Sequence, residues 1–123
     1  MKYIRTKDGR IIDVYDCWST KAFEIEPDEN YWVTEWLIRN GLRREDCKIA
    51  DTIEELCDRC VVIHKYGERP KDMSFYEAQY FIDVWTRKVK SNDPVVAIYG
   101  AVWTDKGLIY VAKMNDKGEL ELL

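Results

Sequence analysis

The tripeptide Asp-Lys-Gly occurs twice near the end of the chain, at 105–107 and 116–118, and this repeat constrains the fold more than any other feature. Each copy follows a Thr or an Asn, so that four residues make a type I turn closed by Gly in the left-handed region. The segments beside these turns, 95–103, 108–114 and 119–123, are β-prone. The pattern therefore predicts a three-stranded antiparallel meander.

The strands of this meander differ in their expected exposure. The first is apolar on both faces, which predicts a central strand that is covered on each side. The last alternates Glu119 and Glu121 with Leu120 and Leu122. This alternation predicts one face in water and a place nearer the edge of the sheet.

The start of the chain predicts a hairpin. Two β-prone runs, Tyr3–Thr6 and Arg10–Tyr15, flank Lys7-Asp8-Gly9, and Asp-Gly is typical of a tight hairpin turn. Further along, Val61–His64 predicts a brief strand, and 67–71 a loop.

Two longer helices are predicted from apolar spacing. Residues 27–40 place apolar side chains at helical intervals, and Gly41 suits a stop just after the helix. Ser74 and Glu77 form a capping-box pair ahead of an i, i+3, i+4, i+7 pattern, which predicts a helix over 75–90.

A shorter helix is predicted after Asp51, which pairs as N-cap with Glu54. Together these elements predict an α+β fold: an N-terminal hairpin, two or three helices and a C-terminal three-stranded antiparallel meander, forming one sheet packed by helices. With 123 residues, 46% of them apolar and 34% charged, the chain is expected to be a single domain spanning residues 1–123.

The charge balance bears on partners. The chain has 19 Lys and Arg against 23 Asp and Glu, a net charge of −4, which opposes attraction to nucleic acid and to anionic membranes. A basic protein surface is the better match.

No run reaches the roughly 18 apolar residues that a membrane span needs, and no apolar leader segment follows Met1. A cytoplasmic location is therefore expected.

The chemistry-bearing residues are sparse. Cys57 and Cys60, with His64, are ligand types that zinc accepts, so a small zinc protein or enzyme is one alternative. Structural zinc needs a fourth ligand, and buried packing explains both cysteines more simply. The chain has one histidine and none of the familiar nucleophile or phosphate-loop motifs. We therefore expect no enzyme activity, no cofactor and no metal.

Two groups of basic residues lie beside aromatic ones, where they could hold phosphates. The first gives a second alternative, a small-molecule or nucleotide-binding protein, although Glu45 and Asp46 offset its charge. The charge of the second suits the end of a helix. The two groups are Arg39, Arg43 and Arg44, and Arg87, Lys88 and Lys90.

The aromatic content is the most unusual remaining feature, with five Trp and eight Tyr. Core filling accounts for some of these side chains. Exposed Trp and Tyr are the usual anchors of protein interfaces. The candidates for contact with a partner are Trp18, Tyr31, Trp32 and Tyr66.

Three stretches carry a resemblance to a known group of proteins: residues 1–9, 50–58 and 98–123. They resemble small uncharacterised accessory proteins of phages and prophages of Gram-positive, clostridial-type bacteria. After Leu56-Cys57-Asp58 such proteins continue with an acidic residue and an aromatic, whereas this chain has Arg59 and Cys60. The departure indicates that Cys60 occupies a packing position. The resemblance implies an accessory role in a bacterial cytoplasm and no site residue.

These observations favour a phage- or prophage-type accessory protein without catalytic activity, acting by protein–protein binding. The expected partner is a host protein, which the binding could inhibit, or a second copy of the chain. Neither a membrane nor a nucleic acid is expected as partner.

Overall fold

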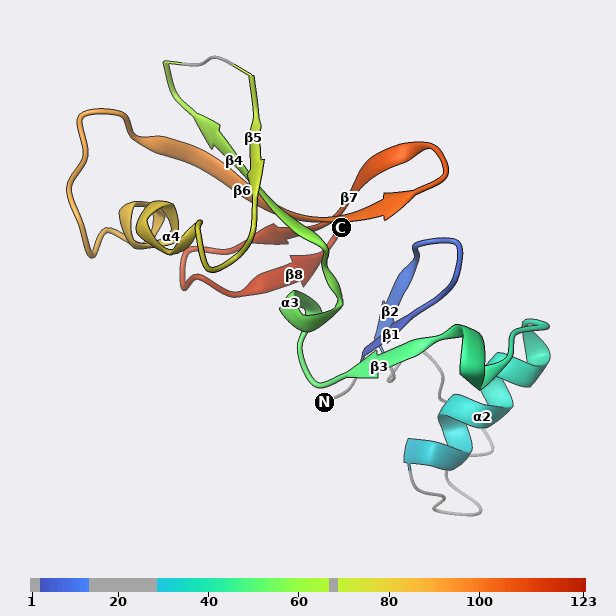
Figure 1. Ribbon diagram of the computed structural model, residues 1–123. Coiled ribbons are helices and arrows are strands. Elements are labelled where there is room, and N and C mark those ends of the chain that lie inside the picture. Colours follow the sequence, from blue (N-terminus) through green and yellow to red (C-terminus); the bar gives the residue numbers. More distant parts are fainter. Residues whose placement is uncertain (1–2, 14–28, 67–68) are drawn as a thin grey trace. The chain divides into compact units, whose positions relative to one another are not determined.

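The computed structural model describes residues 3–13, 29–66 and 69–123 (Figure 1). The chain divides into two compact units, Met1–Leu56 and Cys57–Leu123. Each has its own apolar cluster of buried residues. The expectation of a single domain concerns cooperative folding, which this division does not test, so it stays a prediction.

The first unit contains a three-stranded antiparallel sheet in the order β2-β1-β3. The predicted hairpin is confirmed, with Arg5 opposite Ile11. The core of the first unit holds Ile4, Val33 and Leu37, all buried. The elements are β1 (Tyr3–Arg5), β2 (Ile11–Asp13), α2 (Glu29–Arg39), the 3-10 helix η2 (Arg44–Asp46), β3 (Lys48–Ala50) and α3 (Ile53–Leu56).

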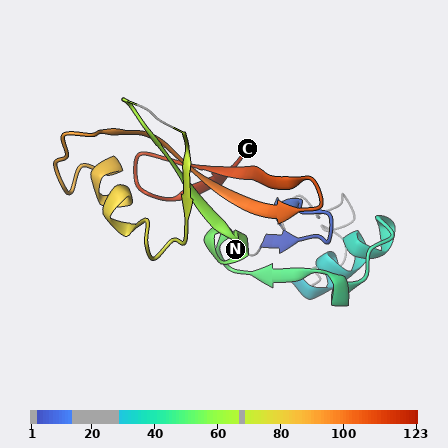
Figure 2. The ribbon, with the colours of Figure 1, turned by 45° about the horizontal axis from the view of Figure 1, so that its top comes forward.

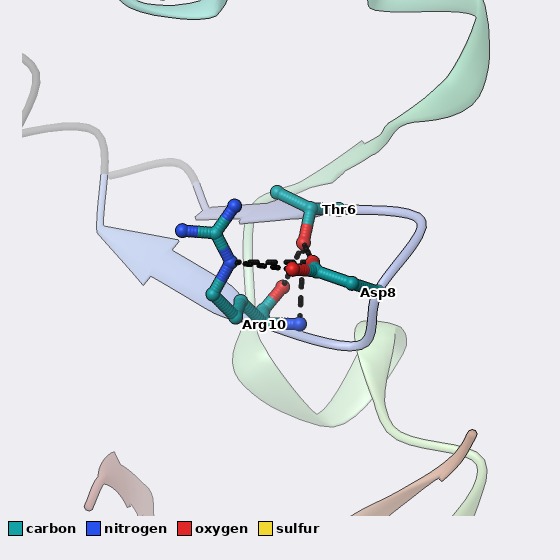
Figure 3. Close-up of polar contacts among 3 residues, drawn as sticks. All are labelled: Thr6, Asp8 and Arg10. Atoms are coloured by element: carbon teal, nitrogen blue, oxygen red, sulfur yellow. Dashed lines mark hydrogen bonds and ion pairs between the residues drawn. The ribbon is translucent and has the colours of Figure 1, made fainter. Parts of the chain in front are cut away.

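The turn of this hairpin is held by three polar side chains (Figure 3). The Thr6 hydroxyl donates a hydrogen bond to Asp8, and Nε of Arg10 donates to Oδ2 of Asp8 at 3.0 Å. Gly9 has φ 90°, the left-handed conformation expected of the Asp-Gly turn. The Thr6 hydrogen bond, with the Arg10 guanidinium, holds the pKa of Asp8 below its usual value.

We predict a pH dependence from this turn. Because the folded-state pKa of Asp8 lies below the unfolded value of about 3.9, its contribution is fully present above that pH and is lost as the pH falls through the folded pKa. The effect is small, since the Asp8 side chain is 60% exposed. NMR titration of the Asp8 carboxyl checks it: Thr6→Val should raise the midpoint toward the ordinary value. A wild-type midpoint at or above about 3.9 would contradict the prediction.

The ends of α2 and α3 are set by local hydrogen bonds. Gly41 has φ 68°, and Leu42 N donates to Leu37 O at 2.9 Å, so the predicted stop at Gly41 is confirmed as a Schellman motif. The cap of α3 lies one residue later than predicted. Thr52 Oγ1 accepts the amide of Glu55 at 3.3 Å, and Oε2 of Glu55 accepts the amide of Thr52 at 3.2 Å.

The second unit contains a five-stranded antiparallel sheet in the order β5-β4-β6-β7-β8. Its middle strand is β6, and β8 lies at an edge, as predicted for the first and last strands of the meander. The elements are β4 (Arg59–His64), β5 (Lys71–Met73), α4 (Gln79–Trp85), β6 (Val95–Thr104), β7 (Gly107–Met114) and β8 (Leu120–Leu122). No helix in the described part of the chain has the length and apolar character to cross a bilayer.

The predicted fold class is wrong. The described residues form two antiparallel sheets, of three and five strands, with three short α-helices, and not one sheet packed by helices. The meander is part of the larger sheet. The prediction missed β3 and β5 because each has three residues, too few to show a period of two, and neither lies beside an Asp-Gly or Asp-Lys-Gly turn of the kind that marks the equally short β1, β2 and β8. Pairing with β1 and with β4 makes them strands.

The helix predicted over 75–90 is also shorter than expected, since α4 covers Gln79–Trp85. The Ser74 cap is present, with Oγ accepting the Glu77 amide at 3.1 Å, but turns precede the helix. Arg87 ends it with φ 66°. Phe81, Ile82 and Trp85 pack against the buried cluster around Ile98 and Val62. Figure 2 shows the helix on one side of the sheet.

Gly100 is required where β6 crosses the core. A Cβ there would lie 2.7 Å from Sγ of Cys57 and 3.2 Å from Cδ1 of Leu120. We expect Gly100→Ala to lower the free energy of unfolding by about 1–3 kcal/mol, measured by urea denaturation. Cys57→Ala removes the nearest atom, so the double variant should lose less than the sum of the two single losses. Additive losses would show that the Cys57 contact does not cause the strain.

Candidate functional site

Three aromatic side chains project from one face of the β6–β7 hairpin. Tyr99 and Trp103 are four residues apart on β6, so they lie on the same face. Tyr110 on β7 pairs with Ala101, which lies between them. We call Tyr99, Trp103 and Tyr110 the aromatic face.

An irregularity in β7 completes this face. Tyr99 pairs with Lys113 and Ala101 with Tyr110, so β7 has one more residue than β6 over this interval. This bulge puts Lys113 and Tyr110 on the same face although they are three positions apart. A regular ladder would have put them on opposite faces.

The aromatic face is ordered by its own contacts and remains open to solvent. The rings of Tyr99 and Tyr110 stack with centroids 4.9 Å apart and planes 21° apart. Nζ of Lys113 lies 5.9 Å from the centroid of the Tyr99 ring. Trp103 is 55% exposed and Tyr110 38% exposed. A partner would meet a Tyr99–Tyr110 pair whose rotamers are restricted by stacking.

Asp58, the residue before β4, holds the backbone of β6 beneath this face. Oδ2 of Asp58 accepts the amide of Trp103 at 2.7 Å, and the amide of Asp58 donates to the carbonyl of Ala101 at 2.9 Å. These bonds satisfy the β6 backbone just where the β4 ladder ends.

The middle of β6 agrees with the expected central, covered strand, and its ends do not. Ala97 and Ala101 on one face and Ile98 and Val102 on the other are buried, whereas Val96 is 45% exposed and Trp103 55% exposed. Central position follows from pairing along the sheet, whereas coverage depends on what packs on each face. In the second unit, α4 packs on the face that holds Ile98.

Comparison with protein-family models, with curated proteins and with solved structures gave no match. The site is therefore interpreted from its residues alone.

Of the four aromatic residues chosen from sequence, only Tyr66 has a side chain that the structure describes. Trp18 lies outside the described residues, as do the side chains of Tyr31 and Trp32, whose backbone is in α2. Tyr66 is 72% exposed, with Nζ of Lys65 at 5.7 Å from its ring. It lies near the start of β6, because the preceding residue's amide bonds to Pro94, whereas Trp103 lies near the end of that strand.

The spacing of Tyr99 and Trp103 in the sequence already places both side chains on one face of a strand. It does not predict that they are exposed, because the apolar residues on both faces of β6 indicate burial.

The arginines of the first basic group, Arg39, Arg43 and Arg44, make ion pairs or hydrogen bonds within their own unit. Arg39 lies 3.7 Å from Glu35, and Arg43 pairs with Glu45 at 2.9 Å and with Asp46 at 3.1 Å. Nη1 of Arg44 donates to Thr34. These ion pairs reduce the positive charge that the nucleotide-binding alternative needs at this group.

The possible zinc ligands do not converge. Cys60 and His64 are four residues apart on β4, which separates their backbones by about 13 Å, and Cys60 is fully buried in the core. Among the described residues no group of three His, Cys, Asp or Glu side chains is placed to hold a metal ion. Nδ1 of His64 instead lies 3.0 Å from Oδ2 of Asp93, without the alignment of a good hydrogen bond.

Proposed function

We propose that the chain is a protein-binding accessory protein of the phage or prophage type, without catalytic activity, acting in the bacterial cytoplasm. The observation that carries the proposal is the aromatic face of the β6–β7 hairpin. Its proposed partner is a host protein with a basic surface, which the binding inhibits.

The composition and order of this face support a binding role. Trp and Tyr are the side chains that most often dominate the energy of protein interfaces. The stacked pair Tyr99–Tyr110 loses little conformational entropy on binding because its rings already contact each other. The net charge of −4 favours approach to a basic surface.

Site-specific photocrosslinking in a Gram-positive host cell tests the proposal. A photoreactive phenylalanine replaces Trp103 in one variant and Tyr76 in a matched control, because Tyr76 is 92% exposed and lies outside the aromatic face. We expect one host protein to crosslink at position 103 and not at position 76. Crosslinking to a second copy of the chain would replace the host partner by self-association.

The crosslinked protein is then purified and its affinity measured directly. Trp103→Ala and Tyr110→Ala should each weaken binding by about 30-fold, whereas Tyr76→Ala leaves it unchanged. Circular dichroism confirms that each variant is folded. No crosslink specific to position 103, or equal affinity of all the folded variants, would overturn the proposal.

A further inference from the structure

An open groove lies at the end of α4, on the second unit. It has a volume of ≈ 870 Å³ and runs along the loop that joins α4 to β6. A neighbouring hollow of ≈ 550 Å³ shares Val84, Arg87 and Pro94 with it. These volumes are in the range of small-molecule sites, about 300–1,000 Å³.

The groove combines cations with apolar walls. Arg87 and Lys90 line it, and neither makes an ion pair with a described residue. The ring of Tyr80 and the side chains of Val84 and Val89 form apolar surface beside them. A ligand with an anionic group and an apolar or aromatic body matches this lining.

The contrast with the first basic group supports this assignment. Arg39 and Arg43 are paired with carboxylates of their own unit, whereas Arg87 and Lys90 have no ion pair with any carboxylate in the described part of the chain. Uncompensated positive charge in a chain of net charge −4 attracts an external anion.

Two carboxylates also line these hollows. Asp93 lines the groove, but one of its oxygens lies 3.0 Å from Nδ1 of His64, which lies behind it. Asp116 lines the neighbouring hollow and not the groove. The cations of the groove itself therefore outnumber its carboxylates.

The backbone at Arg87 is unusual for a side-chain-bearing residue. The amide of Lys88 donates to the carbonyl of Asp83 at 2.8 Å and that of Arg87 to Val84 at 3.1 Å, so α4 ends in the same Schellman motif as α2. Gly41 fills the left-handed position in α2, but Arg87, at φ 66°, fills it in α4. A residue with a Cβ is strained there, and such strain is typical of functional positions.

We propose that this groove binds a small phosphate monoester that carries an aromatic or apolar group. A phosphate monoester has nearly two negative charges at neutral pH, which suits two cations better than a carboxylate does. The guanidinium of Arg87 offers paired donors to phosphate oxygens, and the Tyr80 ring packs against the body of the ligand. The site is separate from the aromatic face and does not rest on the proposed function.

NMR titration of the labelled chain with phenyl phosphate tests the site. We expect the amide signals of Arg87, Lys90 and Asn92 to shift saturably, with a Kd of about 1 mM or tighter. Inorganic phosphate, which lacks the ring, and benzoate, which has one charge, should each bind about tenfold more weakly. The absence of saturation with phenyl phosphate, or equal binding of all three compounds, would overturn the proposal.

Variants separate this site from general charge attraction. Arg87→Gln should weaken phenyl phosphate binding about tenfold, whereas Lys106→Gln, the same change of charge in the β6–β7 turn, leaves it unchanged. Arg87→Gly should raise the urea midpoint by relieving strain and still weaken phenyl phosphate binding about tenfold. Equal losses in Arg87→Gln and Lys106→Gln, or full binding by Arg87→Gly, would contradict the assignment.

Discussion

Ile98→Ala is expected to lower the free energy of unfolding by about 2–5 kcal/mol. Ile98 is fully buried in the middle strand of the five-stranded sheet, in the cluster that joins β4 and β6 to α4. Removing three carbons there loses apolar burial and leaves a cavity that the flanking strands cannot fill. Such a loss is a large part of the 5–15 kcal/mol that stabilises a typical domain. Urea unfolding followed by circular dichroism measures it.

The matched control for this change is Ile109→Ala. Ile109 is on the neighbouring strand β7 and is 41% exposed, so the same substitution should cost about 1 kcal/mol or less. Similar losses for the two variants would show that the core of the second unit does not centre on Ile98.

Leu37→Ala is expected to cost a similar 2–5 kcal/mol through the first unit. Leu37 is 2% exposed and packs with Ile4 and Val33, so its truncation opens a cavity between α2 and β1. If the chain is one domain, Leu37→Ala and Ile98→Ala should shift the same single unfolding transition. Fluorescence and circular dichroism, recorded on the same samples, should then give coincident curves.

The control for Leu37 is its neighbour on α2. Ile38 is 71% exposed, and Ile38→Ala should change the free energy of unfolding by about 0.5 kcal/mol or less. Two separated transitions, with Leu37→Ala moving one and Ile98→Ala the other, would replace the single domain by two independently folding units.

The sequence predicts the hairpin that carries the aromatic face, but it does not predict the bulge in β7 or the exposure of Trp103. The turn at 104–107 was predicted, and it creates the hairpin that carries Trp103. The β7 bulge that aligns Lys113 with Tyr110 leaves no mark in the residue pattern, because it depends on how β7 registers against β6. Exposure of Trp103 also depends on what packs over it, which an apolar run does not reveal.

The groove at α4 shows the same limit. The basic run from Arg87 to Lys90 was predicted as the last turn of a helix, whereas α4 ends at Trp85 and Arg87 follows it in the left-handed conformation. Which of the two basic groups pairs with carboxylates depends on residues brought together by folding. The sequence alone favoured Arg39, Arg43 and Arg44, whereas the structure places cations without an ion pair to a described residue beside a groove at Arg87.

The sequence by itself determined the local elements of this protein: the Asp-Gly hairpin, the Asp-Lys-Gly turns, the Gly41 stop and the order of strands in the meander. These depend on a few neighbouring residues, whose steric and hydrogen-bonding preferences are set by residue type. Only the tertiary structure decided that there are two sheets, because the short strands β3 and β5 form by pairing with distant strands. It also decided which aromatic and basic side chains stay exposed, since burial is a property of packing between segments far apart in the chain.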